Sequence, residues 1–181
     1  MHSSETFFCD EYHVSAGSVL FRFQPRPQIC VLRNKKNGET VLPKGHKDLN
    51  ETIEEAALRE TYEETGWPCE FMPTDILTRV PPAGQSSGTH PRLAPSSTEA
   101  IAVTFRRLDE TGKDIKFVWW FITQVTSTER SLGTQMDSEN FDPEFVDLDE
   151  VVNQLSRPGD RDVVVRALDL VRKTKAKSPS E

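Results

Sequence analysis

Hydrophobic and polar positions alternate along the first part of the chain in a way that predicts short β-strands. Residues 13–23 alternate in part and predict one strand, which ends at two prolines. Residues 29–32 are a short apolar run that predicts a second, buried strand. The pair Asn37-Gly38 is the strongest hairpin signal in the chain, so residues 39–42 are expected to return as a third strand.

One short helix follows, and both of its ends carry local signals. Thr52 with Glu55 fits a capping box, which places the first helical residue at Ile53. Gly66 fits the left-handed residue just past the last turn. The residues between are mostly good helix formers, so the helix is expected to span the interval between the two signals.

The side chains of this helix form an apolar stripe that becomes acidic halfway along. At 100° per residue its members are, in order, Ile53, Ala56, Ala57, Glu60, Glu63 and Glu64. A helix built only for packing keeps such a stripe apolar to its end. Like charges one turn apart repel, and acids near a helix C-terminus oppose the helix dipole. A solvated acidic helix end is therefore less favourable than a site for a hard divalent cation, which prefers convergent carboxylate oxygens.

More strands and a long loop are predicted after the helix. Residues 69–72 and 75–80 are candidate short strands, and residues 81–97 are rich in proline, serine and glycine, which predicts a mobile or functional loop. Residues 99–107 and 113–125 form an apparent hairpin, whose second strand is the most apolar run of the chain and should be central. Its adjacent tryptophans point to opposite faces, one into the core and the other under a helix.

The last part of the chain predicts a short edge strand and two helices. The strand is expected over residues 143–147, after a polar loop, and the first helix over 148–155 with Asp147 as its N-cap. A break at Pro158-Gly159 precedes an amphipathic helix over 162–173. Strands, one helix, more strands and two late helices favour an α/β fold with helices on both faces of a mixed sheet.

The length of 181 residues suits one domain with a sizeable core. We expect a flexible N-terminal arm over residues 1–11, a single domain over 12–174 and a tail over 175–181 that is disordered by composition. A hydrophobic fraction of 35% and a charged fraction of 28% are typical of a globular protein, and no apolar run is long enough for a membrane span. A monomer is expected.

The three cysteines are widely spaced, form no CxxC pair and suggest no zinc site. Reduced thiols and an N-terminus without a basic region followed by an apolar core predict a cytoplasmic, or also nuclear, protein without a signal peptide. A secreted protein whose signal peptide was removed earlier stays the alternative.

Positive charge is concentrated in one segment of an acidic chain. The net charge is −7, which disfavours general nucleic-acid binding. Residues 13–47 contain seven lysines and arginines and one acid, so that segment carries 7 − 1 = +6 and the remainder −7 − 6 = −13. A basic patch beside an acidic helix is what a polyanionic phosphate ligand needs, although some of these side chains are expected to be solvated turn residues.

A motif around the helix resembles the Nudix box. Gly45, five residues, Glu51, seven residues and the run 59–67, RETYEETGW, match G-x5-E-x7-R-E-U-x-E-E-x-G-U, where U is a bulky apolar residue. Every fixed position is present over 23 residues, which makes the match far more specific than a lone glycine fingerprint. Thr61 departs from the apolar preference of its position, which concerns local packing rather than chemistry.

The resemblance implies a Nudix α/β/α sandwich and a metal-dependent hydrolase of a diphosphate linked to another group. It implies that Glu60, Glu63 and Glu64 hold Mg²⁺, with Mn²⁺ as a possible substitute, and that the Lys44 carbonyl is a further ligand. Arg59 would orient Glu60 through a salt bridge, and Glu51 would fix the loop. The alternative role for Arg59 is an ordinary surface ion pair at i, i+4 spacing with Glu55 or Glu63.

Hydrolysis also needs a general base for the attacking water. The resemblance implies a glutamate either inside the box or on a distant loop. We favour Glu60 or Glu64, with Glu99 as the candidate outside the box and Glu144 as a weaker one.

The substrate is less strongly indicated. The residues Leu-Pro-Lys-Gly-His46 resemble the branch of the family that includes diphosphoinositol polyphosphate and diadenosine polyphosphate hydrolases. The residues expected to bind substrate phosphates are Arg22, Arg33, Lys35, Lys36, Lys44, His46 and Lys47, with Lys116 as an addition. The local basic excess favours inositol pyrophosphates. A dinucleotide is the alternative and would need an aromatic clamp from Trp119, Trp120 or Tyr62.

Two hypotheses from other functional classes stay open. A catalytically dead phosphate-binding module would have lost a metal carboxylate of the box, and this chain retains all of them. An enzyme that removes mRNA caps would carry a wider basic surface than a chain of net charge −7 provides. A small-molecule polyphosphate is therefore the expected partner.

Overall fold

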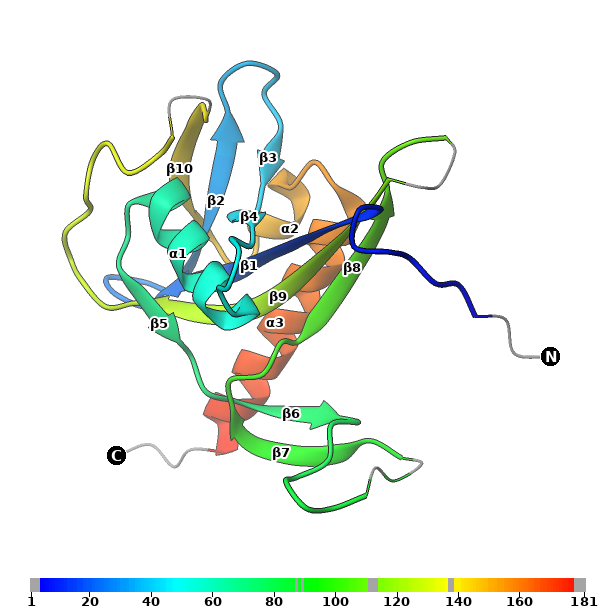
Figure 1. The fold of residues 1–181 in the computed structure, drawn as a ribbon. Coiled ribbons are helices and arrows are strands. Elements are labelled where there is room, and N and C mark those ends of the chain that lie inside the picture. Colours follow the sequence, from blue (N-terminus) through cyan, green and yellow to red (C-terminus); the bar gives the residue numbers. More distant parts are fainter. Residues whose placement is uncertain (1–3, 87, 89, 111–113, 137–138, 178–181) are drawn as a thin grey trace.

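The computed structural model describes residues 4–86, 88, 90–110, 114–136 and 139–177. Its elements are, in chain order, β1 (Tyr12–Arg22), β2 (Gln28–Asn34), β3 (Thr40–Val41), β4 (Lys44–His46), α1 (Ile53–Thr65), β5 (Cys69–Phe71), β6 (Thr74–Thr78), β7 (Arg92–Ser97), β8 (Ala102–Arg107), β9 (Ile115–Val125), β10 (Phe141–Asp147), α2 (Val151–Gln154) and α3 (Pro158–Lys177). Eight strands form one mixed sheet, and β6 with β7 forms a separate two-stranded sheet (Figure 1).

The mixed sheet is built around β1 and β9, which run parallel from the pair Tyr12–Ile115 to the pair Phe21–Gln124. On the β1 side, β2 and then β10 continue the sheet, while β8 and β5 pair with different halves of β9. The short strands β3 and β4 pair with β2 and β1. The prediction that the tryptophan strand is central is confirmed, and β10 lies at an edge as expected.

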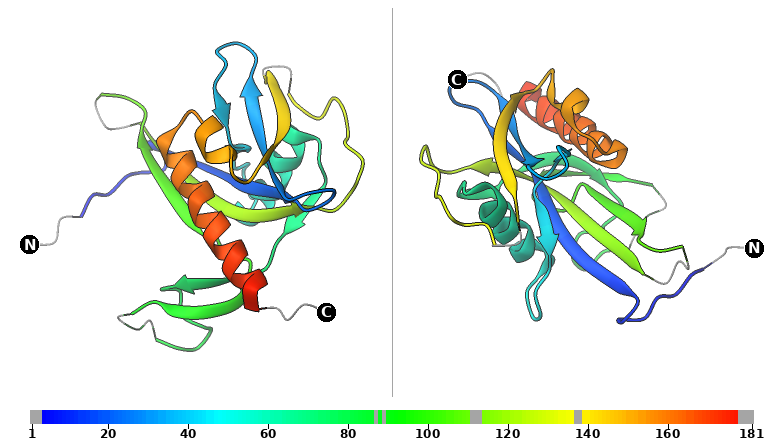
Figure 2. Two further views of the ribbon diagram at one scale, coloured as in Figure 1. Left: turned by 180° about the vertical axis from the view of Figure 1, so that it is seen from behind. Right: turned by 90° about the horizontal axis from the view of Figure 1, so that it is seen from above.

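Helices cover both faces of this sheet, as predicted. Figure 2 shows α1 on one face and α2 with α3 on the other. The face under α3 holds the larger core, in which Trp120 and Phe21 are fully buried against side chains of α3. The face under α1 holds a smaller cluster built on Ala56 and Ala57, and Trp119 packs at its border. Alanines at this contact let α1 lie close to the sheet.

The predicted ends of α1 are confirmed. The capping box of Thr52 and Glu55 is formed in both directions, and Gly66 has the left-handed conformation with φ 75°. The polar Thr61 has buried partners in its packing position: its hydroxyl donates to the Ala57 carbonyl, and it lies 2.8 Å from the hydroxyl of Ser18. Ser18 in turn lies 2.7 Å from the Thr123 hydroxyl. These bonds satisfy groups that would otherwise be costly to bury.

Several predictions for the second half of the chain are wrong. The predicted loop 81–97 ends in β7, which pairs with β6 and so gains backbone hydrogen bonds that its composition did not indicate. The predicted break at Pro158 is instead the first residue of α3, where the missing proline N–H costs nothing. The first late helix is only the four-residue α2, with Glu150 rather than Asp147 at its N-cap.

Side-chain contacts explain some of these differences. The carboxylate of Asp147 does not cap α2, because it accepts from Gln28 at 2.8 Å and pairs with Arg26 at 3.0 Å. Helix α3 continues through Lys177, so the first three residues of the predicted tail are helical, while 178–181 lie outside the described residues. Thr111 and Gly112 of the predicted hairpin turn also lie outside them.

The N-terminal residues 4–11 contact strand β8 of the sheet. Within the predicted arm, Glu5 pairs with Arg107 of β8 at 2.8 Å. The three cysteines are free thiols, of which Cys9 is exposed and Cys30 buried. In the part of the chain that the structure describes, no helix is both long and apolar enough to cross a membrane.

Candidate active site

Helix α1 brings its acidic residues against the short strand β4. The stripe predicted from the sequence is buried at Ala56 and Ala57, and it stays buried at Glu60 and Glu64, each of which is 3% exposed. Glu63 lies nearer the surface, with 30% of its side chain exposed. Two carboxylates are therefore out of contact with most solvent, which is unfavourable unless cations or hydrogen-bond donors compensate them.

Gly45 makes room for one of these carboxylates. A Cβ atom at Gly45 would overlap with the carboxylate of Glu60, so no other residue fits there without displacing that side chain. Burial raises the pKa of Glu60, and the adjacent Arg59 guanidinium opposes this effect. The glycine that opens the box motif therefore has a direct steric role at the acidic cluster.

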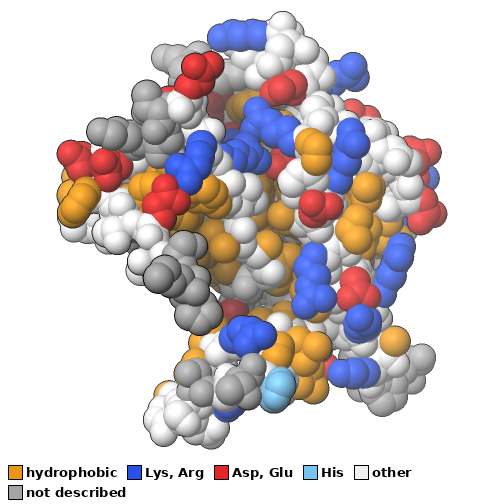
Figure 3. Space-filling model, turned by 90° about the vertical axis from the view of Figure 1, so that its right-hand side faces the viewer, with side chains coloured by type: hydrophobic (Ala, Val, Ile, Leu, Met, Phe, Trp, Pro, Cys, Tyr) orange, Lys and Arg blue, Asp and Glu red, His pale blue; other side chains and the backbone are white. Residues whose placement is uncertain are grey.

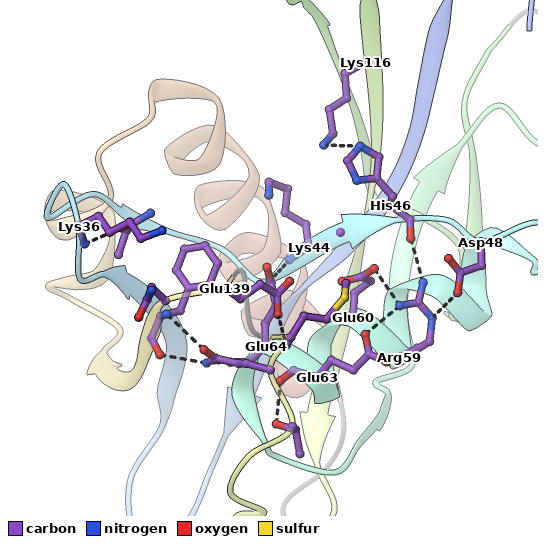
Figure 4. Close-up of a pocket in the computed structure, with 17 residues that line it drawn as sticks. Lys36, Lys44, His46, Asp48, Arg59, Glu60, Glu63, Glu64, Lys116 and Glu139 are labelled. Atoms are coloured by element: carbon purple, nitrogen blue, oxygen red, sulfur yellow. Dashed lines mark hydrogen bonds and ion pairs between the residues drawn. The ribbon is translucent and has the colours of Figure 1, made fainter. Parts of the chain in front are cut away.

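Arg59 holds three acidic residues of the site together. Its guanidinium donates to Glu51 at 2.7 Å, to Glu60 at 2.8 Å and to Glu63 at 2.9 Å. It also donates to the backbone carbonyl of His46 at 2.8 Å, which ties α1 to β4 (Figure 4). The hydrogen bond from Arg59 lowers the pKa of Glu51. Arg59 therefore makes both contacts considered from the sequence: the i, i+4 ion pair with Glu63 and the salt bridge that orients Glu60.

Glu64 and Glu139 complete the cluster. The backbone N–H of Lys44 donates to Glu64 at 2.6 Å. Burial raises the pKa of Glu64 to about 8, although the nearby positive charge of Lys44 opposes the shift. One carboxylate oxygen from each of Glu60, Glu64 and Glu139 lies within 4.8 Å of the others. Three convergent carboxylates, two of them buried, are a donor set that fits a hard divalent cation.

Glu139 was missed by the sequence reasoning. It lies in the polar loop before β10, where a carboxylate has no periodic neighbours to single it out. Glu99, the predicted candidate outside the box, lines a different cavity with Trp119 and Phe121. Glu144 is exposed on β10 and does not line the cavity of the acidic cluster.

A cavity of about 580 Å³ opens over the cluster. Its lining includes the acidic residues Asp48, Glu60, Glu63, Glu64 and Glu139. Its basic residues are Lys36, Lys44, His46, Lys116 and Arg59. Figure 4 shows Lys36, Lys44 and Lys116 placed around the acids of α1. The cavity therefore combines a carboxylate cluster with several cations, an arrangement suited to a phosphate ligand with bound metal.

Four of the predicted substrate-binding residues lie elsewhere. The guanidinium of Arg22 stacks on the Phe145 ring at 3.7 Å, and the amine of Lys35 pairs with Asp142 at 2.8 Å. The amine of Lys47 donates to the Asp48 carbonyl, and Arg33 is exposed on β2. None of the four lines the cavity over the acidic cluster.

Lys116 joins the basic side of the cavity from β9. Its amine lies 3.4 Å from Nε2 of His46. Burial lowers the pKa of Lys116 to about 8, and the positive charges of Lys44 and Arg106 add to the effect. Burial, followed by the charge of Lys116, lowers the pKa of His46. Crowded, partly desolvated cations of this kind are stabilised by an anionic ligand.

Aromatic side chains are scarce in this cavity. Among the described residues that line it, Phe141 is the only aromatic side chain other than His46. Trp119 and Phe121 instead line a second cavity of about 760 Å³, while Trp120 is buried in the core. Figure 3 views the molecule from the β8 side and shows hydrophobic side chains in a hollow above the lower lobe, which contains the β6–β7 hairpin.

Comparisons with known proteins agree with the fold and the motif. A family model described as NUDIX domain matches residues 11–167. A NUDIX hydrolase from Nitrosomonas europaea superposes with a TM-score of 0.58 and 14% identity, over 87% of this chain and 88% of that one. The Ap4A hydrolase of C. elegans superposes with a TM-score of 0.55 and 15% identity, over 87% of this chain and 97% of that one. A NUDIX-family hydrolase from Clostridium perfringens superposes with a TM-score of 0.56 and 17% identity, over 91% of this chain and 99% of that one.

Proposed function

Because the chain belongs to the NUDIX domain family, we propose a specific substrate for it. We propose that it uses Mg²⁺ to hydrolyse the diphosphate group of an inositol pyrophosphate. Family membership makes it a Nudix hydrolase with the Nudix α/β fold, acting on phosphoanhydride bonds of a small-molecule phosphate substrate. The nature of the group attached to the diphosphate is the part that is proposed.

Glu60, Glu64 and Glu139 are the residues we assign to hold the metal, with Glu63 at the border of the cluster. The Lys44 carbonyl stays a predicted ligand, supported by the position of Lys44 beside Glu64. Bound Mg²⁺ or Mn²⁺ would polarise phosphoryl oxygens, lower the pKa of a bound water and stabilise the leaving phosphate. The protein supplies the carboxylates, fixes them through Arg59 and Gly45, and surrounds the phosphates with cations.

Two carboxylates are suited to take the proton of the attacking water. Glu60 accepts from Arg59 and fits tightly under Gly45, so it is less available than Glu64 or Glu139. Glu139 is only half-buried and lines the cavity, so a water can reach it. Because Glu99 lines another cavity, we assign the role of the carboxylate outside the box to Glu139. Glu64→Gln and Glu139→Gln, each assayed for Mn²⁺ affinity as well as for kcat, distinguish the two: the base is the residue whose replacement lowers kcat far more than it lowers Mn²⁺ affinity.

The observation that carries the substrate proposal is the composition of the cavity over the cluster. Lys36, Lys44, His46 and Lys116 line it, whereas the candidates for an adenine clamp do not. Trp120 is in the core, and Trp119 lines the second cavity. An inositol pyrophosphate presents several phosphates and no base, so it matches many cations and few aromatic rings.

A dinucleoside polyphosphate is the second candidate. The second cavity favours it, because the half-buried Trp119 lines it together with Ile53 at the start of α1. An adenine ring could stack there. The structural similarity to an Ap4A hydrolase, at 15% identity, supports only the shared fold.

A substrate panel with Mg²⁺ tests the proposal. The purified protein is offered a diphosphoinositol polyphosphate, a diadenosine polyphosphate and a capped RNA, with Glu64→Gln as the inactive control. We expect turnover of the inositol pyrophosphate. Cleavage of the dinucleotide without inositol pyrophosphate turnover would reject the substrate proposal. If no substrate is hydrolysed and the protein binds one of them with the same affinity as Glu64→Gln, it is a binding module.

A further inference from the structure

The loop after β9 caps the C-terminal end of α1. The last carbonyls of a helix have no partners within the helix and need donors from elsewhere. Four donors of this loop supply them: Thr134 Oγ1 to Glu63 at 2.7 Å, Gln135 Nε2 to Glu64 at 2.8 Å, Arg130 Nε to Thr65 at 2.9 Å and the Ser131 N–H to Gly66 at 2.8 Å. The end of the helix that carries the acids is thus fixed by residues far along the chain.

Gln135 differs from the other donors because it also bonds to β10. Its side-chain NH₂ donates to the Phe141 carbonyl at 2.9 Å, and its carbonyl oxygen accepts from the Phe141 N–H at 3.2 Å. With the bond to Glu64, one amide side chain makes three hydrogen bonds to backbone groups. Gln135 therefore connects the end of α1 directly to the first residue of β10.

Glu139 lies between Gln135 and its bonding partner Phe141 in the chain. Its N–H donates to the Met136 carbonyl at 2.9 Å, and its carboxylate accepts from the Met136 N–H at 3.0 Å. The same carboxylate belongs to the cluster with Glu60 and Glu64. The bonds between Gln135 and Phe141 therefore join two described residues on either side of Glu139, the third carboxylate of the cluster.

We propose that Gln135 is a positioning residue that holds Glu139 in the metal-binding cluster. The proposal rests on the proposed function, since it requires the cluster to bind a divalent cation. A carboxylate on a loop loses conformational freedom when it coordinates a cation. Side chains that fix a ligand beforehand reduce that loss, and removing such partners lowers metal affinity.

A double-mutant cycle measured by calorimetry with Mn²⁺ and the protein alone tests this role. Gln135→Met keeps the length of the side chain and removes all three hydrogen bonds. In the wild-type background we expect it to weaken Mn²⁺ binding about tenfold. In the Glu139→Gln background we expect no further weakening, because the residue through which Gln135 acts has already lost its charge.

Two additional variants separate positioning from general stability. Arg130→Met removes the donor to the neighbouring carbonyl of the same helix end. Among the described residues, the hydrogen bond of Arg130 goes to Thr65 and not to β10. We expect this variant to lower the melting temperature and leave Mn²⁺ affinity unchanged. Gln135→Asn keeps the amide but is one carbon shorter, so it should weaken Mn²⁺ binding as the methionine variant does. It also serves as the test if Gln135→Met does not fold.

The outcomes are distinguishable. Equal weakening by the Gln135 variants in both backgrounds, or equal weakening by Arg130→Met, would show a general effect of the helix end and overturn the proposal. Unchanged Mn²⁺ affinity would also overturn it. If the wild-type protein hydrolyses its substrate and binds Mn²⁺ in these cases, only the role of Gln135 is rejected. If the wild-type protein does not bind Mn²⁺ at all, the proposed function fails as well.

Discussion

The carboxylate of Glu60 lies in the space that a side chain at Gly45 would occupy. The two residues come from α1 and β4, which are separated in the chain by the loop after β4. Their contact means that the backbone of β4 approaches the acidic cluster more closely than any residue with a Cβ atom allows. The geometry of the cluster therefore depends on a residue that has no functional group.

Gly45→Ala should damage the site without unfolding the protein. The added methyl group would push the Glu60 carboxylate away from Glu64 and Glu139, and we expect metal affinity and kcat to fall by about 10–100-fold, as for other changes to the support of a ligand. Gly159→Ala is the matched control, because a Cβ there meets no atom within 4 Å. Equal kinetics for Gly45→Ala and wild type would contradict the steric account.

Arg59→Lys should lower activity although it keeps the positive charge. Arg59 makes separate hydrogen bonds to Glu51, Glu60 and Glu63, and the single amine of lysine cannot span all three. We expect kcat/KM to fall by about 10–100-fold. Arg172→Lys, at an exposed residue 4.0 Å from Asp149, provides the control in the same kinetic assay. Full activity in Arg59→Lys would mean that charge alone suffices.

Glu64→Gln should stabilise the metal-free protein and remove its activity. Glu64 is buried and its pKa is raised to about 8, so at pH 7 folding must either bury its charge or take up a proton, and glutamine avoids both while still offering an oxygen to the Lys44 N–H. With EDTA present we expect the melting temperature to rise by several degrees, since about 1 kcal/mol corresponds to about 2–4 °C for a domain of this size.

Scanning calorimetry measures the effect, and Glu129→Gln at an exposed position is the control. Turnover of Glu64→Gln should fall by orders of magnitude in the presence of Mg²⁺. A large drop in the melting temperature would instead indicate that the carboxylate of Glu64 is needed for folding.

Substrate capture should weaken as the pH rises through about 8, which is the lowered pKa of Lys116. A lysine is positively charged below its pKa and neutral above it. The attraction between Lys116 and a phosphate is therefore present below this pH and is lost above it. We expect the kcat/KM of the wild-type protein to fall over this pH range. The kcat/KM of Lys116→Met should already be low at pH 7 and should change less with pH.

The measurement is a set of pH–rate profiles at constant ionic strength. Lys173→Met, on the exposed side of α3 where Lys173 pairs with Asp169, should keep the wild-type profile. A Lys116→Met profile that falls as steeply as the wild-type profile would assign the titration to another group.

Local sequence signals were sufficient to predict α1 and its acids. The bonds of Thr52 and the φ angle of Gly66 involve residues within a few positions, so they can be read from the chain directly. The wrong predictions share the opposite property. Strand β7 is paired with β6 through backbone bonds to residues 14 or more positions earlier, and the Asp147 carboxylate is bound by Gln28 and Arg26 instead of capping α2.

The candidate site was predictable where it depends on residues close in the chain, as for the fold. Glu60, Glu63 and Glu64 follow from helical spacing, whereas Glu139 joins them from a loop in which Gln135 bonds to the end of α1, 71 residues away in the chain, and to the nearby start of β10. The sorting of the basic residues is also a property of the folded chain. Lys36 and Lys44 reach the cavity, while Lys35, one position earlier than Lys36, pairs with Asp142 outside it.

The hydroxyl groups of Thr61, Ser18 and Thr123 form a continuous chain between α1 and the sheet. These three positions consequently constrain one another as a group during sequence divergence. A change of Thr61 alone to the bulky apolar residue common in the motif would remove one of the two hydroxyl partners of Ser18, leaving Thr123, and would place a larger side chain beside both. A lineage could move from the polar to the apolar solution only by replacing the members together or through a less stable intermediate sequence.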